Sequence, residues 1–220
     1  AVGKVPIDLK STGIDMLSLS SHKFHGPKGL GALYVRRGTR FRPLLRGGHQ
    51  ERGRRAGTEN APAIVGLGKA AEMTMATMTD DMARITALRD RLEKGLVQAV
   101  GHCFVTGDPY DRLPNTSTIA FEYIEGEAIL LLLNKQGIAA SSGSACTSGS
   151  LEPSHVLRAM DIPFTAAHGA IRFSLSRETT DADVDRVLGA VPAIIDQLRE
   201  MSPFWSRDGA APQTFDPAYA

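Results

Sequence analysis

Lys23 stands in the segment SLSSHKFHGPKG, between a strand-like run and a glycine-rich turn. The residues around it are small or polar, namely Ser20, Ser21, His22 and glycines at positions 26, 29 and 31. A lysine amine held in a partly dry pocket gives up its charge more readily and can form a Schiff base with a carbonyl group. Glycines allow the backbone to approach a flat ring or a phosphate closely. The segment predicts a covalent catalytic lysine, with a lysine in a surface loop as the simpler alternative.

Two histidines in the same segment, His22 and His25, raise the question of a metal site. Protein zinc sites combine histidines with Cys or acidic ligands, and no cluster of these accompanies the pair. The segment also lacks the G-x-x-x-x-G-K-[ST] pattern of a nucleotide phosphate loop. We therefore expect no metal here.

A second polar segment, RGGHQERGRRAGTEN, carries four arginines and Thr58 among glycines; the arginines are Arg46, Arg52, Arg54 and Arg55. Guanidinium groups and free backbone N–H groups match the oxygens of a phosphate or a carboxylate. A solvated charged loop is the plainer interpretation. A nucleic-acid surface is not favoured, because the segment has no aromatic residues on which bases could stack.

Cys146 lies within SSGSACTSGSLEP, a stretch of small residues that cannot contribute to a core. A thiol in such a loop is accessible, and a helix expected to begin near Pro153 would favour the thiolate if the loop folds toward its N-terminus. A small residue in a tight loop is the alternative, although Ser or Ala would serve there equally well. The other cysteine, Cys103, is expected to be a small apolar residue in a strand.

Arg172 is placed in the apolar run AIRFSLS, between Ile171 and Phe173. A charged side chain in such a strand needs an anionic partner, because burying an unpaired charge is costly. Either an Asp or Glu of the chain or the carboxylate of a ligand would satisfy it.

Composition bounds the class of protein. The chain has 220 residues, 42% of them hydrophobic, and a formal net charge of +1. The balanced charge gives no reason to expect nucleic acid or an anionic membrane as a partner. No apolar run approaches the roughly 20 residues of a transmembrane helix, and the N-terminus does not resemble a signal peptide. With only two cysteines, a reduced cytoplasmic protein is expected.

Hydrophobic periodicity predicts an α/β protein. Strands are expected at 14–21, 30–37, 102–106, 116–123, 138–142 and 170–176. Helices are expected at 61–78, from about 79 to 99, and at 126–136, 153–160 and 181–201. The two long helices near residues 60–100 suggest a domain hinge.

Four of these segments, in this order and spacing, resemble the pyridoxal-phosphate-dependent cysteine desulfurases of the class V aminotransferase family. The branch that serves nitrogenase iron–sulfur assembly is the most similar, and the housekeeping branch follows. No segment is convincing alone, but four in register are highly specific. They are SHKFHGPKGLGALYVRRG, RGGHQERGRRAGTEN, SSGSACTSGSLEPSHVLRAM and IRFSLSRETT.

The resemblance implies fold type I, with residues 1–75 as the C-terminal part of the cofactor-binding large domain. Residues 76–220 would form the small α/β domain, with the Cys146 loop and a loose tail. The implied activity converts L-cysteine to L-alanine in a homodimer and passes the sulfur to an iron–sulfur scaffold or another acceptor protein.

The resemblance also implies individual roles. Lys23 would carry pyridoxal phosphate, with His22 beside it and Ser20 and His22 binding its phosphate. Thr58 would reach the phosphate held by the partner subunit. Arg172 would bind the substrate carboxylate, and Cys146 would take the sulfur as a persulfide.

The resemblance covers only the C-terminal portion of these enzymes. The Asp that pairs with the pyridine nitrogen and the His that stacks on the cofactor ring have no counterpart here. We therefore expect this chain alone to be inactive. A selenocysteine lyase, another class V enzyme, or a non-catalytic fragment that dimerises or binds a partner are the alternatives.

Overall fold

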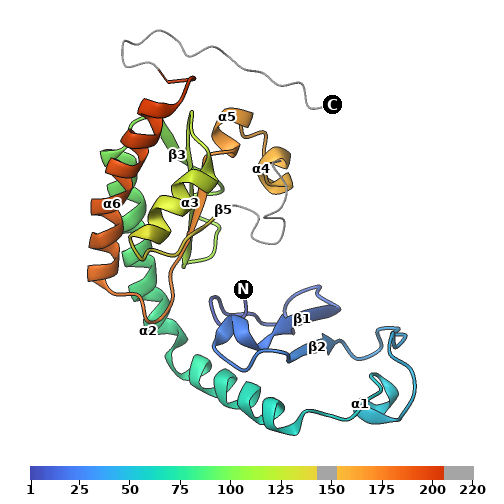
Figure 1. Cartoon of the computed structure of the whole chain (residues 1–220). Coiled ribbons are helices and arrows are strands. Elements are labelled where there is room, and N and C mark those ends of the chain that lie inside the picture. Colours follow the sequence, from blue (N-terminus) through green and yellow to red (C-terminus); the bar gives the residue numbers. More distant parts are fainter. Residues whose placement is uncertain (143–152, 206–220) are drawn as a thin grey trace. The chain divides into compact units, whose positions relative to one another are not determined.

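The computed structural model describes residues 1–142 and 153–205, and the chain divides into two compact units, Ala1–Asp80 and Asp81–Ala220. Figure 1 shows the elements of each unit along the chain. The interpretation from sequence placed the division near residue 75. No helix of the described residues is long and apolar enough to cross a membrane.

Unit 1 is built on a two-stranded antiparallel sheet. It contains β1 (Met16–Ser20), the 3-10 helix η1 (Ser21–Phe24), β2 (Gly31–Val35) and the short turn α1 (Gln50–Gly53). Met16 pairs with Val35 and Ser20 with Gly31, as expected for two strands joined by a glycine-rich connection. Arg36, just after β2, donates hydrogen bonds to the carbonyl oxygens of Leu9, Thr12 and Ile14, which fastens the first residues to the sheet.

A long helix, α2 (Ala61–Ala99), begins in unit 1 and continues into unit 2. The expectation of two helices, at 61–78 and from about 79 to 99, was therefore wrong. No glycine or proline interrupts the chain there, so the backbone hydrogen bonds continue without a break. The actual N-terminal cap is Asn60, whose Oδ1 accepts a hydrogen bond from the Ala63 N–H at 3.2 Å.

Unit 2 contains a four-stranded antiparallel sheet in the order β3-β4-β6-β5. The strands are β3 (Cys103–Val105), β4 (Thr116–Phe121), β5 (Ser141–Ser142) and β6 (Ala170–Ser174). The helices are α3 (Gly126–Lys135), α4 (His155–Ala159), α5 (Phe164–Ala167) and α6 (Asp181–Met201). The predicted strands of this unit all form.

The sheet of unit 2 is covered on both faces. On one face the second half of α2 packs with α3 and α6 around Ile119, Ile171 and Phe173. On the other face Ala120 and Ala170 pack against Leu157 of α4 and against two alanines of α5. Successive residues of a strand point to opposite faces, so the odd positions of β6 join the large core and the even positions face α4 and α5.

Unit 1 has almost no core of its own. Among its described residues, Phe24 is the only buried hydrophobic side chain. Large apolar side chains of both strands, Met16 and Leu33 among them, are exposed. A unit of this size normally buries a hydrophobic cluster, and unit 1 does not.

Candidate functional site

Lys23 is held at the surface of unit 1 by one turn of 3-10 helix. Side chains three residues apart lie on the same side of such a turn, and here Ser21 and Phe24 are the buried pair. His22 and Lys23 fall on the opposite side and are exposed, and Ser20, the last residue of β1, is exposed as well. The structure thus brings Ser20, His22 and Lys23 onto one short, solvent-facing segment.

Backbone hydrogen bonds and one glycine fix this turn. The Ser21 N–H donates to the Leu30 carbonyl at 3.0 Å, and the Gly26 N–H donates to the Ser21 carbonyl at 3.0 Å. His25 adopts the left-handed conformation, with φ of 69°, and closes the turn. A Cβ on residue 26 would overlap Ser21 Oγ, so a larger residue there would force the buried Ser21 side chain to move.

The donors on this turn fit pyridoxal phosphate. Lys23 Nζ has no hydrogen bond or ion pair with any described residue, so its amine is available for a carbonyl group. The exposed hydroxyl of Ser20 and imidazole of His22 are suitable phosphate donors. Ser21 Oγ is buried and, within the described part of the chain, has no hydrogen-bond partner. Nothing in this donor set conflicts with the cofactor.

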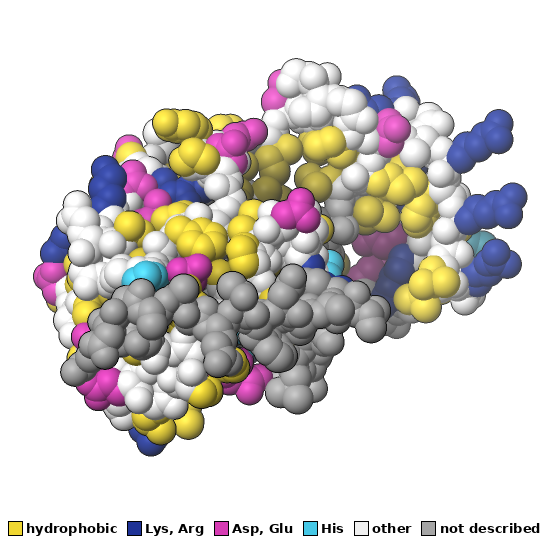
Figure 2. Space-filling model, turned by 90° about the horizontal axis from the view of Figure 1, so that it is seen from above, with side chains coloured by type: hydrophobic (Ala, Val, Ile, Leu, Met, Phe, Trp, Pro, Cys, Tyr) yellow, Lys and Arg dark blue, Asp and Glu magenta, His cyan; other side chains and the backbone are white. Residues whose placement is uncertain are grey.

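The arginine-rich segment of unit 1 is exposed. Basic side chains project into solvent at the end of unit 1 that carries α1 (Figure 2), and Arg46, Arg52, Arg54 and Arg55 are all exposed. None of the four forms a salt bridge with a described residue. Thr58 is exposed two positions before the cap of α2, next to Gly57, whose N–H donates to Gln50 Oε1 at 3.2 Å. Phosphate binding by Thr58 stays a prediction.

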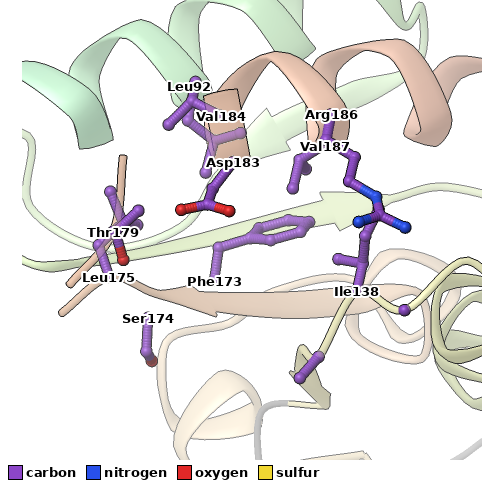
Figure 3. Close-up of a pocket in the computed structure, with 12 residues that line it drawn as sticks. Leu92, Ile138, Phe173, Ser174, Leu175, Thr179, Asp183, Val184, Arg186 and Val187 are labelled. Atoms are coloured by element: carbon purple, nitrogen blue, oxygen red, sulfur yellow. The ribbon is translucent and has the colours of Figure 1, made fainter. Parts of the chain in front are cut away.

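Arg172 is placed on β6, the strand between β4 and β5. Its paired residue on β4 is Thr118, and its paired residue on β5 is Ser141. Figure 3 shows Phe173 pointing toward the helices and Ser174 pointing the other way. By strand alternation Arg172 shares the face of Ser174, away from the large core.

The contacts of Arg172 with the described residues include no acidic partner. No Asp or Glu among the described residues pairs with it, and its Nε is buried without a hydrogen-bond partner. Within the described part of the chain, its one hydrogen bond runs from Nη2 to Ser141 Oγ, at 3.4 Å. A serine hydroxyl does not neutralise a guanidinium, so Arg172 is available for an anionic ligand.

Two hollows in unit 2 are lined by neither Arg172 nor Ser141. The one in Figure 3, of about 190 Å³, is lined by Phe173, Asp183 and Arg186 among others, and Phe173 places it on the face of β6 opposite to Arg172. A larger apolar hollow of about 420 Å³ lies between Tyr123, Phe164 and Phe204, with His168 and Glu125 at its wall. Sequence reasoning identified neither of them, because each is formed by residues from separate elements.

The structure describes only one of the two cysteines, Cys103. Cys146 lies outside the described residues. Cys103 is partly buried in β3, and its Sγ donates to the Val100 carbonyl at 2.9 Å. Burial raises the pKa of the Cys103 thiol above its ordinary value, which disfavours the reactive thiolate.

Positions 206–220 of the loose tail expected at 202–220 also lie outside the described residues. The first residues of that tail are not loose, because Ser202 Oγ donates to the Tyr123 carbonyl at 2.6 Å and Trp205 packs against His102 and Tyr123.

Ser141 and Thr118 are the residues near Arg172 that sequence reasoning did not single out. Neither belongs to a recognisable pattern of its own. Their position beside Arg172 follows from the register of β4, β6 and β5, which pairs residues 118, 172 and 141. The stretch IAASS predicted a strand but not its partner, so only the three-dimensional pairing reveals them.

A model of the family described as aminotransferase class-V matches residues 1–187. The chain belongs to this family. A cysteine desulfurase of Gluconacetobacter diazotrophicus is 69% identical over 220 residues, covering 100% of this chain and 55% of that protein. The cysteine desulfurase NifS of Azotobacter vinelandii is 68% identical over 222 residues, again covering 100% of this chain and 55% of the relative.

A solved structure gives the same result for the fold. The NifS-like protein from Rickettsia africae is 32% identical with a TM-score of 0.81, covering 89% of this chain and 51% of that one. The resemblance to cysteine desulfurases and the predicted fold class are both confirmed. The chain spans about half the length of the curated relatives it matches.

Proposed function

We propose that the complete protein is a pyridoxal-phosphate-dependent cysteine desulfurase, which converts L-cysteine to L-alanine and supplies persulfide sulfur for iron–sulfur cluster assembly. The observation that carries the proposal is Arg172, a strand arginine with no acidic partner among the described residues. It lies in a chain 69% identical to a protein named cysteine desulfurase. The similarity to NifS favours the nitrogen-fixation branch.

The division of the chain fits this proposal. Residues 1 to about 75 would be the C-terminal part of the large, cofactor-binding domain, and the remainder the small domain. Exposed Met16 and Leu33 on the sheet of unit 1 support this, because they would be covered by the parts of the large domain outside this chain.

Lys23 would hold the cofactor through its amine, and Ser20 and His22 would donate to its phosphate. Thr58 would reach the phosphate bound by the partner subunit, which makes a homodimer part of the function. When bound, the cofactor supplies a ring that stabilises negative charge at the substrate α-carbon. Lys23 Nζ would then be the base that accepts the proton from that carbon and later returns it.

Arg172 would fix the orientation of L-cysteine by pairing with its carboxylate. A guanidinium and a carboxylate form parallel charge-assisted hydrogen bonds, which set direction as well as affinity. The carboxylate would supply the anionic partner that this guanidinium lacks within the described residues.

Cys146 would be the sulfur acceptor. Its thiolate would attack the substrate sulfur, so that an S–S bond forms and the Cβ–S bond breaks. The electron pair of that bond stays with the carbon, which takes up a proton to become the methyl group of alanine. Cys146 is five residues from Ser141, and five extended residues span up to about 17 Å, enough to bring the thiol near a ligand of Arg172.

The test compares this chain with the complete, cofactor-loaded enzyme. Only the complete enzyme should release alanine and sulfide from L-cysteine in equal amounts when a reducing thiol is present. A complete enzyme that binds the cofactor but acts only on selenocysteine would show a lyase instead. Failure of the complete enzyme to bind the cofactor would contradict the whole proposal.

A further inference from the structure

We propose that Ser141 is a positioning residue that sets the orientation of the Arg172 guanidinium, so that its two terminal nitrogens face the substrate carboxylate. This inference rests on the proposed function, because it concerns how Arg172 would receive that carboxylate. It adds a residue whose role follows from strand pairing rather than from any sequence motif.

The hydroxyl of Ser141 is oriented before any ligand arrives. Ser141 Oγ donates its hydrogen to the Ser142 carbonyl at 2.8 Å. Because that hydrogen is used, only oxygen lone pairs are directed at Arg172, whose Nη2 lies 3.4 Å away. The contact therefore has one polarity, with arginine as donor and serine as acceptor.

The rest of the guanidinium leaves one edge for a ligand. Nε is buried and has no partner among the described residues, so a ligand does not reach it directly. Nη2 has two hydrogens and uses one on Ser141, which leaves one on Nη2 and two on Nη1. A carboxylate can pair with this terminal edge in the bidentate manner. Rotation of the guanidinium away from Ser141 would turn this terminal edge away from the carboxylate.

The strand pairing explains why residue 141 holds this position. Ser141 and Arg172 are directly paired across β5 and β6, so their side chains lie on the same face of the sheet. On the opposite flank, Thr118 of β4 is paired with Arg172 as well, but its hydroxyl forms no hydrogen bond with a described residue. As far as the described residues go, the support for the guanidinium thus comes from one side.

The experiment uses the complete, cofactor-loaded enzyme and two substrates that differ in charge, L-cysteine and L-cysteine methyl ester. The measured quantity is the ratio of their kcat/KM values, which reports recognition of the carboxylate. Ser141→Ala should lower the preference for L-cysteine about ten-fold, through KM, as expected for the loss of support to a charged donor. Ser141→Thr keeps the hydroxyl and should keep the preference.

Ser174→Ala is the matched control. Ser174 is an exposed residue of β6 on the same face as Arg172, and its side chain has no hydrogen bond with a described residue. This variant should leave the substrate preference within two-fold of the parent. A general loss of stability would lower kcat/KM for both substrates together and would not move their ratio.

A second readout needs neither cofactor nor activity. The sample is the 220-residue chain with 15N-labelled arginine. The rotation that exchanges the two protons on each Arg172 Nη should be slower in the parent chain than in the Ser141→Ala variant. Equal rotation rates, an unchanged substrate ratio in Ser141→Ala, or an equal loss in Ser141→Thr would each overturn the inference. If Arg172→Ala itself leaves the ratio unchanged, the carboxylate role in the proposed function fails as well, which separates the two failures.

Discussion

Lys23 and Phe24 are consecutive residues of one 3-10 turn and face opposite ways, with Phe24 only 3% exposed and Lys23 exposed to solvent. The buried phenylalanine anchors the turn, and it is the only buried hydrophobic side chain among the described residues of unit 1. A chemically available amine is therefore held by a fixed backbone. The described residues do not by themselves form the partly dry pocket expected around a Schiff-base lysine, because Lys23 is exposed.

The first prediction concerns the site of attachment. Reduction of the complete, cofactor-loaded enzyme with borohydride should attach the cofactor irreversibly to the peptide that contains Lys23. Lys23→Arg keeps the positive charge but cannot form the bond, so labelling should disappear. Lys28→Arg, an exposed lysine five positions later, is the control and should label normally. Peptide mass spectrometry measures both, and label on Lys28 would contradict the assignment.

A second prediction tests the turn itself. Gly26→Ala places a Cβ where Ser21 Oγ already lies, so the buried Ser21 side chain, and with it the tightly packed turn, must adjust. Such overpacking costs about 1–3 kcal/mol and would move Lys23. Borohydride labelling at Lys23 should fall in parallel. Gly13→Ala, where an added Cβ meets nothing within 4 Å, is the control and should label like the parent. Normal labelling in Gly26→Ala would show that the turn does not position the lysine.

Much of the fold was predictable because hydrophobic periodicity and turn-forming residues indicate the same strands and helices. β2, β4 and β6 carry β-branched and aromatic residues, and β1, which alternates apolar residues with serines, is joined to β2 by a glycine-rich turn. The continuity of α2 was not predictable, because Thr79 and Asp80 are typical capping residues. The local sequence does not show whether a helix ends there. Continuation depends on the neighbouring turns, in which Ile85 and Leu88 pack into the core of unit 2.

The candidate site was predictable only in part, for a related reason. Lys23 and Arg172 stand out because each is a charged residue in an unusual local setting. Ser141 does not, since its importance depends on lying opposite Arg172 across two strands 31 positions apart. Strand register is set by long-range packing, and a sequence pattern of period two does not specify the partner strand.

The third prediction concerns Arg172. Arg172→Ala removes a charge-assisted pair with the substrate carboxylate, commonly worth about 1.5–3 kcal/mol, so KM for L-cysteine should rise by roughly one to two powers of ten. The control is Arg186→Ala, which removes an exposed arginine on α6 beside the hollow of Figure 3. Steady-state kinetics of the complete enzyme measures both. An unchanged KM in Arg172→Ala would make it a structural residue.

A fourth prediction is a pH dependence of stability in unit 2. Glu93 of α2 receives hydrogen bonds at 2.8 Å from Arg112 to both carboxylate oxygens, and at 2.6 Å from Ser117. Burial alone would raise the pKa of Glu93, but these donors outweigh it and lower the pKa below its ordinary value. The Glu93 carboxylate therefore stabilises the fold at pH values above the pKa of Glu in the unfolded chain, about 4.3. This contribution is lost as the pH falls through the lower, folded pKa.

Glu93→Gln should therefore destabilise unit 2 by about 2 kcal/mol at pH 7, with a difference from the parent that shrinks toward pH 3. Denaturant unfolding at several pH values measures this. Glu72→Gln removes an exposed ion pair with Lys69 and should change the free energy of unfolding by less than about 0.5 kcal/mol. A pH-independent difference for Glu93→Gln would indicate altered packing rather than lost charge pairing.

The last prediction separates the two cysteines. In the complete, cofactor-loaded enzyme, Cys146→Ala should still bind L-cysteine but lose nearly all alanine formation, because the substrate sulfur has no acceptor thiolate. Cys103→Ala should retain turnover, since the Cys103 thiol is partly buried and burial raises its pKa. Alkylation after one turnover, followed by peptide mass spectrometry, should find one extra sulfur on Cys146 and none on Cys103. Normal turnover in Cys146→Ala, or the extra sulfur on Cys103, would show that the persulfide forms elsewhere.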